Sequence, residues 1–322
     1  DLLGVWYIIY YPDMQRYFQF SILSMVFTYL LIFIGGLVRV SGAGMGCPDW
    51  PRCFGRWIPP TSLSQLPDYI DPEKFNLVLA WVEYLNRLFG ALVGFIILIT
   101  FVLGYLHFKK SKRVLLSISI AFFLTLLEGW VGAKLVDTVL DPITITIHLL
   151  LALIIIGLII YSSIQSYYII VGNFEKSSNY HPHLKSVIVG ILVCLFIEII
   201  IGTEIRGGLD MSRKDNPLIE SIILLKMLGP FKYIHTILGF SLLGLTLYLR
   251  KIVYDIKFKS SPFMINSVNS IMILIVTQIL LGESLVFFDV KPLMQLFHMW
   301  FSSLLIGLAV SVFTFWKISL EP

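Results

Sequence analysis

The chain has 322 residues, of which 57% are hydrophobic and 14% are charged, and its formal net charge is +4 at pH 7. Because soluble domains average about 25% charged residues, this composition excludes a water-soluble globular domain, a disordered chain and a coiled coil. Several apolar runs reach the ~20 residues that a helix needs to cross a bilayer, and runs of this length predict helices rather than barrel strands. The basic residues lie mostly in short loops, so nucleic acid is not expected as a partner.

The apolar runs predict eight membrane spans. They cover residues 17–39, 76–107, 114–136, 143–172, 186–205, 221–249, 263–286 and 293–316. Residues 2–11 are also apolar but too few to span, and we expect them at the membrane interface. An even number of spans places both termini on one side, and half of the 24 Lys and Arg residues lie there. Their excess is sharpest at residues 109–113, which predicts cytoplasmic termini for a multi-pass protein of the inner (plasma) membrane, surrounded by lipid.

The second half of the chain repeats the first. "EYLNRLFGALVG" (83–94) aligns with "KYIHTILGFSLLG" (232–244). Residues 131–148 align with residues 281–298, and both segments have ten residues from Gly to Pro and six from Pro to His. The repeat predicts two bundles in the same orientation, as in some repeat-built transporters.

The fold class expected is therefore all-α: a membrane protein of eight transmembrane helices arranged as two pseudo-symmetric four-helix bundles. The N-terminal bundle is predicted at residues 14–172 and the C-terminal bundle at residues 184–318.

Three histidines, His148, His235 and His298, lie near the outer ends of even-numbered spans. An imidazole in lipid is costly, so each is expected to face a bundle interior, either bonded to a neighbouring helix or serving as a ligand. His235 and His298 lie on the second and fourth helices of one half, where two imidazoles could clamp a planar haem from both sides. In the other half Asn86 occupies the position of His235, so His148 offers one strong ligand and leaves one haem face open.

Charged residues near these positions allow two interpretations each. Glu83 lies one helical turn before Asn86. In the first interpretation it pairs with Arg87 or is a charge at the level of the lipid headgroups. In the second it is a functional carboxylate that takes a proton or stabilises a positive intermediate. Arg39 and Arg206 end the first and fifth spans in "GGLVR" and "GTEIR", where they either snorkel to the interface or bind haem propionates.

Polar residues also recur four positions before a repeated glycine. The three pairs are Glu128 and Gly132, Glu198 and Gly202, and Gln278 and Gly282. They indicate either a polar layer in the outer half of both bundles or hydrogen bonds between helices.

Cys47 and Cys53 flank "PDWPR" in the first outer loop, whereas Cys194 is an apolar residue of the fifth span. Thiols outside the cytoplasm oxidise readily, so we expect a disulfide in this loop, of which a redox-active pair is a special case. Zinc and copper fit less well than haem, because neither half gathers a third nitrogen or sulfur ligand in the membrane.

Taken together, "GGLVRVSGAGMGCPDWPRCFGRWIPP", "EYLNRLFG", "GTEIRGG", "YIHTILG" and the two Pro-x5-His spans resemble the haem A synthase family. The likeness covers nearly all eight spans. Members of that family are eight-helix membrane oxidoreductases that convert haem O to haem A by oxidising a ring methyl to a formyl group.

The resemblance implies a role for each candidate residue. His235 and His298 are expected to bind the iron of a haem b cofactor, with Arg206 as a further cofactor contact. The substrate haem O is expected at His148, Asn86, Arg87 and Arg39, with Glu83 as the catalytic carboxylate. Cys47 and Cys53 match the paired outer-loop cysteines. Haem O synthase and terminal oxidase assembly factors are candidate partners.

One position departs from the family pattern, because members often carry His where this chain has Asn86. We therefore expect a five-coordinate substrate iron bound through His148, with Asn86 hydrogen-bonded to a water or oxygen species. Two alternatives stay open: a quinol-linked dihaem b-type electron-transfer cytochrome that makes no formyl product, and a haem-free transporter built from repeats.

Overall fold

The computed structural model describes residues 12–68, 70–172, 181–216, 218–255 and 261–320. The described residues are almost entirely helical and contain no β-strand beyond one isolated bridge between Cys53 and Arg56. The apolar stretch at residues 2–11, predicted to be interfacial, lies outside the described residues.

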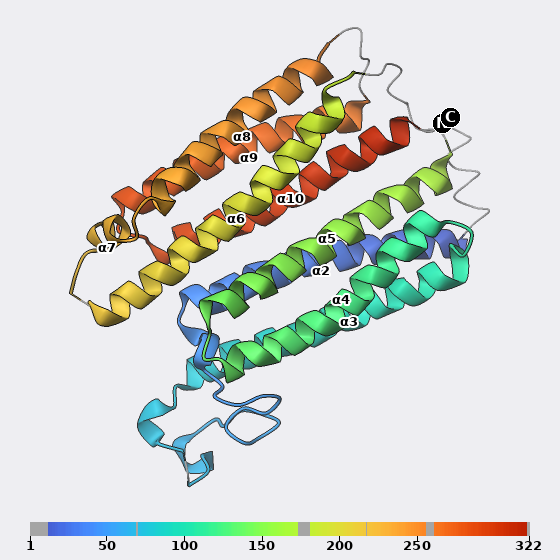
Figure 1. Cartoon of the computed structure of the whole chain (residues 1–322). Helices are drawn as coiled ribbons and strands as arrows, with labels where there is room; N and C mark the ends of the chain where they lie inside the picture. The colour runs from blue at the N-terminus through green and yellow to red at the C-terminus, as the bar shows by residue number, and fades with distance from the viewer. Residues whose placement is uncertain (1–11, 69, 173–180, 217, 256–260, 321–322) are drawn as a thin grey trace.

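Eight of the described helices are long and apolar enough to cross a membrane. They are α2 (Pro12–Val40), α3 (Leu77–His107), α4 (Lys112–Asp137), α5 (Pro142–Val171), α6 (Leu184–Asp215), α8 (Phe231–Val253), α9 (Pro262–Phe287) and α10 (Pro292–Ser319). The predicted all-α membrane protein with eight spans is confirmed. In Figure 1, α2 begins and α10 ends at the same end of the molecule.

Local sequence signals fix where these helices begin. The Asp141 side chain accepts a hydrogen bond from the Thr144 amide (3.0 Å), and Pro142 occupies the first turn of α5. Asn76 caps α3 in the same way through the Leu79 amide (3.1 Å). Such caps accept hydrogen bonds from backbone amides that have no partner inside the helix. Proline is tolerated in the first turn because the amide hydrogen that it lacks would have no helical partner there.

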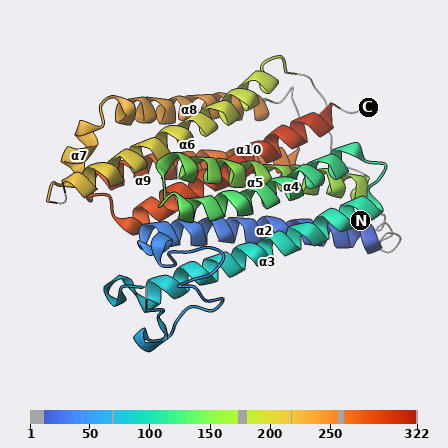
Figure 2. The same ribbon diagram turned by 60° about the horizontal axis from the view of Figure 1, so that its bottom comes forward.

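The helices pack in two groups that fit the predicted pair of four-helix bundles (Figure 1). In the first group α2 and α4 each pack against both α3 and α5; in the second, α8 packs against α6 and α9, and α10 against the same two helices. The groups meet where α10 contacts α2 and α5, and Figure 2 shows α10 and α5 side by side along this seam. Hydrogen bonds between the two groups include those from Trp300 Nε1 to the Tyr29 carbonyl (3.1 Å) and between the Thr146 and Thr203 hydroxyls (3.0 Å).

The sequence repeat extends to the backbone. The connection between α4 and α5 places Val139 and Leu140 at left-handed φ angles of 52° and 61°, and its counterpart between α9 and α10 places Asp289 and Val290 at 54° and 55°. In both, the amide of the second residue donates to the carbonyl five positions earlier at 2.9 Å. Left-handed backbone is uncommon for residues other than glycine, so its recurrence indicates that the two connections have the same conformation. This conformation sets the depth of the histidine that lies six residues after each proline.

The predicted sixth span is wrong in its first part. Residues 221–249 were expected to form one helix, but the chain forms the short α7 (Ser221–Met227), turns, and begins α8 at Phe231. Gly229 adopts a left-handed φ of 72° and Pro230 follows it, a combination that ends one helix and starts another. The fifth span is also longer than predicted: α6 continues to Asp215, and Arg206 pairs with Asp210 in this added part of the helix.

Candidate functional site

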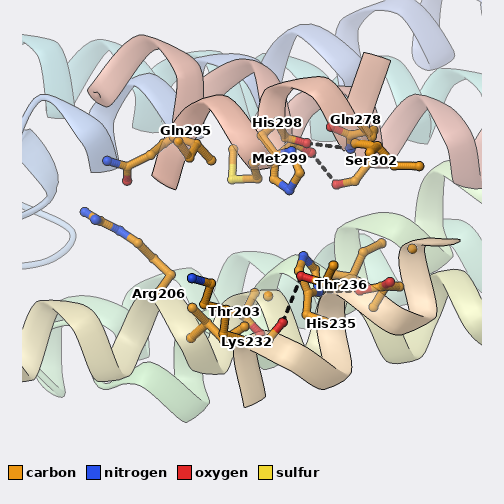
Figure 3. A pocket seen from close by; sticks show the side chains of 18 of the residues that line it. Thr203, Arg206, Lys232, His235, Thr236, Gln278, Gln295, His298, Met299 and Ser302 are labelled. Atoms are coloured by element: carbon orange, nitrogen blue, oxygen red, sulfur yellow. Dashed lines mark hydrogen bonds and ion pairs between the residues drawn. The ribbon is translucent and has the colours of Figure 1, made fainter. Parts of the chain in front are cut away.

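A cavity of about 290 Å³ lies in the C-terminal group of helices. Its walls come mainly from α6, α8, α9 and α10 and are largely apolar, including Leu195, Leu242 and Ile275. The polar groups in its lining are few, as in sites for flat apolar ligands. Most of the polar side chains labelled in Figure 3 are basic, amide or imidazole groups.

His235 of α8 and His298 of α10 project into this cavity from opposite walls (Figure 3). Their ring centres lie 6.2 Å apart and the ring planes meet at 66°. A metal held between two imidazoles at the usual ~2.0 Å metal–nitrogen distance sets the ring centres about 6 Å apart. The two rings therefore fit the ligands of a single iron, as the sequence predicts for haem b.

Each of the three membrane histidines rests against a glycine of the neighbouring helix. A Cβ atom built on Gly202 would lie 3.4 Å from Cε1 of His235, one on Gly282 would lie 3.4 Å from Cε1 of His298, and one on Gly132 would lie 3.5 Å from Cε1 of His148. These are ordinary van der Waals distances, so each imidazole lies beside the neighbouring helix at its glycine and an alanine would still fit there.

The polar residues four positions before these glycines contact the same histidines. The Glu128 carboxylate lies 3.1 Å from Nδ1 of His148, and the Glu198 carboxylate contacts Nδ1 of His235. Gln278 differs, because its amide donates to the backbone carbonyl of His298 (2.7 Å) rather than to the ring. The predicted polar residues thus connect neighbouring helices, and two of the carboxylates lie beside imidazoles.

Arg39 and Arg206 share one carboxylate at the outer end of the C-terminal cavity. Asp210 lies 2.9 Å from Arg206 and 3.6 Å from Arg39, and both arginines line the cavity. Nη1 of Arg206 is buried and has no partner among the described residues. The structure thus places Arg39, expected beside the substrate haem of the N-terminal half, at the cavity that contains His235.

Two residues of this region were missed by the sequence analysis. Lys232 lines the cavity one turn before His235, at the position that Glu83 occupies in the first repeat. The aligned repeats already pair Lys232 with Glu83, so this reversal of charge could have been seen in the sequence. Asp210 carried only a weak signal, its spacing of four residues from Arg206 on one helix.

In the N-terminal half, Glu83 and Arg87 hold the outer loop. Glu83 is 4% exposed; its Oε2 accepts a hydrogen bond from the Cys47 amide (2.9 Å) and its Oε1 accepts one from Nη2 of Arg87 (2.5 Å). Arg87 also donates to the carbonyls of Asp49 (2.8 Å), Arg52 (2.9 Å) and Cys47 (3.2 Å). The pairing of Glu83 with Arg87, one of the two interpretations of the sequence, is present.

The loop held by this pair is closed by a disulfide between Cys47 and Cys53, as predicted. The Asp49 carboxylate tightens it by accepting the amides of Phe54 (2.6 Å) and Gly55 (2.8 Å). Cys194 is unpaired and half-buried within α6.

In the N-terminal half, the counterparts of both His235 and its neighbour Glu198 are different residues. Asn86 replaces the imidazole, and its Oδ1 is buried without a partner among the described residues. Leu31 replaces Glu198, since aligning "GGLVR" with "GTEIR" pairs these two positions. The packing agrees: Oε1 of Glu198 lies 3.4 Å from a Cβ built on Gly239, and Cδ1 of Leu31 lies 4.0 Å from one built on Gly90, the matching glycine.

Comparison with known proteins agrees with the resemblance seen in the sequence. A family model named COX15-CtaA and described as "Cytochrome oxidase assembly protein" matches residues 18–310. A protein named haem A synthase from Wolbachia sp. subsp. Brugia malayi is 26% identical over 314 residues, which is 86% of this chain and 90% of that protein.

A haem A synthase from Shewanella oneidensis is 35% identical over 136 residues, but this match spans only 40% of the chain and 39% of the relative. One from Pelagibacter ubique is 26% identical over 200 residues, 55% of the chain and 57% of that protein. The family match covers most of the chain, and this protein therefore belongs to the COX15-CtaA family of cytochrome oxidase assembly proteins.

Proposed function

We propose that the protein is a haem A synthase, an oxidoreductase that converts the ring methyl group of haem O to the formyl group of haem A. The observation that carries the proposal is the pair of facing imidazoles, His235 and His298, 6.2 Å apart in an apolar cavity of a chain that belongs to this family. The relatives named haem A synthase support the same activity.

The C-terminal cavity is proposed to hold a resident haem b. His235 and His298 would bind its iron, and the unpaired Nη1 of Arg206 together with Lys232 would receive its propionates. Arg39 belongs to the same basic cluster through Asp210. When bound, haem b supplies one-electron transfer to or from the substrate site.

The N-terminal half is proposed to bind haem O as substrate through His148, which Glu128 orients. The opposite face has Asn86 and Leu31 in place of a second imidazole and its carboxylate, so the substrate iron would keep one open position. The buried, unpaired Oδ1 of Asn86 would then bond a water or oxygen species there.

Glu83 is proposed to stabilise positive charge at the methyl carbon or to take its proton. Its contacts with Arg87 and the Cys47 amide hold the carboxylate in one place under the disulfide loop. Each of two hydroxylations would replace one C–H bond of the methyl by C–OH, a two-electron oxidation. With water as the oxygen source, each releases two protons and passes two electrons to an external one-electron acceptor, and loss of water from the resulting hydrate leaves the aldehyde.

We further propose an inner (plasma) membrane location with cytoplasmic termini, from the distribution of basic residues. Haem O synthase and terminal oxidase assembly factors are the proposed partners. The electron-transfer cytochrome and the transporter have less support, because the relatives are named for synthesis of haem A.

The proposal is tested by coexpressing the full chain with a haem O synthase and extracting its bound porphyrins for mass analysis. We expect haem A from the wild type, and neither haem A nor bound haem b from His298→Ala. Wild-type protein that accumulates haem O without any alcohol or formyl product would contradict the proposed activity.

A further inference from the structure

The carboxylates of Glu198 and Glu128 contact histidines in the same way in the two halves. Each lies four residues before a glycine on its own helix, so the glutamate and the glycine of each pair share one helix face. The carboxylate meets Nδ1 of the facing histidine while Cε1 of that ring lies near the glycine. Because Nδ1 and Nε2 point in widely different directions in the ring plane, Nε2 faces away from a carboxylate at Nδ1.

This contact has an electronic consequence for a ligand. A carboxylate that accepts the proton of Nδ1 fixes the tautomer in which Nε2 carries the free lone pair. It also makes the imidazole a stronger donor to a metal on Nε2. Glu198 lies at ion-pair distance from Nδ1 of His235, and its side chain is 10% exposed against 30% for His235.

His298 lacks such a partner. The Gln278 amide group donates to the backbone carbonyl of His298, and among the described residues no carboxylate lies at ion-pair distance from Nδ1 of His298, whereas one does at His235 and at His148. A neutral amide also brings no charge to the ring. The two imidazoles that face each other across one cavity therefore differ, with His235 supported by a carboxylate and His298 not.

The fourth equivalent position supports this interpretation. Where Asn86 replaces the histidine, Leu31 replaces the carboxylate. A carboxylate whose purpose was to bond neighbouring helices could have stayed without an imidazole. Among the four equivalent positions, a carboxylate therefore occurs only opposite an imidazole, although His298 has an imidazole without one.

We propose that Glu198 and Glu128 are positioning residues, which orient His235 and His148 and strengthen them as iron donors, while Gln278 leaves His298 the weaker donor. This inference rests on the proposed function, in which these histidines bind haem iron. A stronger donor favours the more highly charged ferric state, so Glu198 lowers the reduction potential of the bound haem b.

The test is a redox titration of the purified, haem-loaded full chain, with electron paramagnetic resonance spectra of its low-spin haem. In Glu198→Gln the amide can still contact the ring but carries no charge, so haem should be retained and its potential should rise. A tenfold loss of preference for the ferric state corresponds to about 59 mV. Glu198→Ala removes the contact itself and should weaken haem retention by ~10–100-fold.

Two further variants separate this effect from bulk charge. Glu204 lies on the same helix as Glu198 but is exposed and outside the cavity lining, so Glu204→Gln should leave the spectrum unchanged. Gln278→Glu adds a carboxylate beside His298 and should lower the potential. An equal shift in Glu204→Gln, or an unchanged potential in haem-loaded Glu198→Gln, overturns the inference alone. Wild-type protein without a six-coordinate haem overturns the proposed function and the inference together.

Discussion

The two halves of the chain have the same helical architecture but carry different functional side chains at their outer ends. In the C-terminal half, two imidazoles face each other across a cavity with Lys232 and Arg206 near its mouth. In the N-terminal half, a single membrane histidine remains, Asn86 and Leu31 replace the other ligand and its carboxylate, and the Glu83–Arg87 pair holds a disulfide-closed loop.

Under the proposed function, this difference gives the two halves of a duplicated bundle different roles, electron transfer in one and substrate chemistry in the other. Two imidazoles saturate an iron, which suits electron transfer, whereas one imidazole leaves a position for chemistry. The reversal of charge from Lys232 to Glu83 follows the same division, since a cation suits propionates and a carboxylate suits a proton or a developing positive charge.

The largest effect is expected at Glu83. Glu83→Gln keeps an acceptor for the Cys47 amide, but it removes the negative charge and turns an NH2 group toward Nη2 of Arg87. We expect haem A formation to fall by at least ~100-fold, the lower end of the range for general acid–base groups. Mass analysis of haems after coexpression measures it, with the exposed Glu73→Gln as the matched control. Wild-type output from Glu83→Gln would remove this residue from the mechanism.

The next effect concerns the loop that is present only in the N-terminal half. Arg87→Gln removes the charged donor that binds three loop carbonyls. Loss of roughly 2 kcal/mol, typical of a hydrogen bond to a charged group, would make opening of the loop ~30-fold more frequent. Hydrogen exchange of the amides at residues 47–56 reports this opening. Unchanged protection, with Arg52→Gln as the exposed control, would show that Arg87 does not anchor the loop.

A smaller effect is expected from restoring the missing ligand. Asn86→His should occupy the open face of the substrate iron and weaken carbon monoxide binding there by ~10-fold or more, the usual scale for changes around a metal ligand. The double variant Leu31→Glu/Asn86→His should weaken it further, because it restores the carboxylate as well. Equal carbon monoxide binding by the wild type and both variants would contradict an open N-terminal face.

The sequence predicted the spans and the depth of the histidines because both depend on local patterns. Hydropathy locates helices of this length, and the equal spacing from Gly132 and Gly282 to the following proline and histidine predicts equal depth. The break at Gly229 and Pro230 was also visible in the sequence, but the high hydropathy of residues 221–249 favoured a single helix. Here the helix-breaking pair decided the structure.

The remaining features depend on tertiary contacts that no local pattern reveals. Arg39 reaches the C-terminal cavity because α2 packs against α10, and only that packing brings it to Asp210 of α6. Arg87 meets the loop carbonyls because the disulfide and the Asp49 contacts fold the loop back over α3. The finding that Glu83 pairs with Arg87 under the loop therefore needed the folded loop.

The most direct test of the account counts the iron ligands in each half. Electron paramagnetic resonance and magnetic circular dichroism of purified protein carrying both haems should show one bis-histidine low-spin haem, lost in His235→Ala, and one five-coordinate high-spin haem, lost in His148→Ala. Two bis-histidine haems, or a low-spin haem that survives removal of His235, would contradict it.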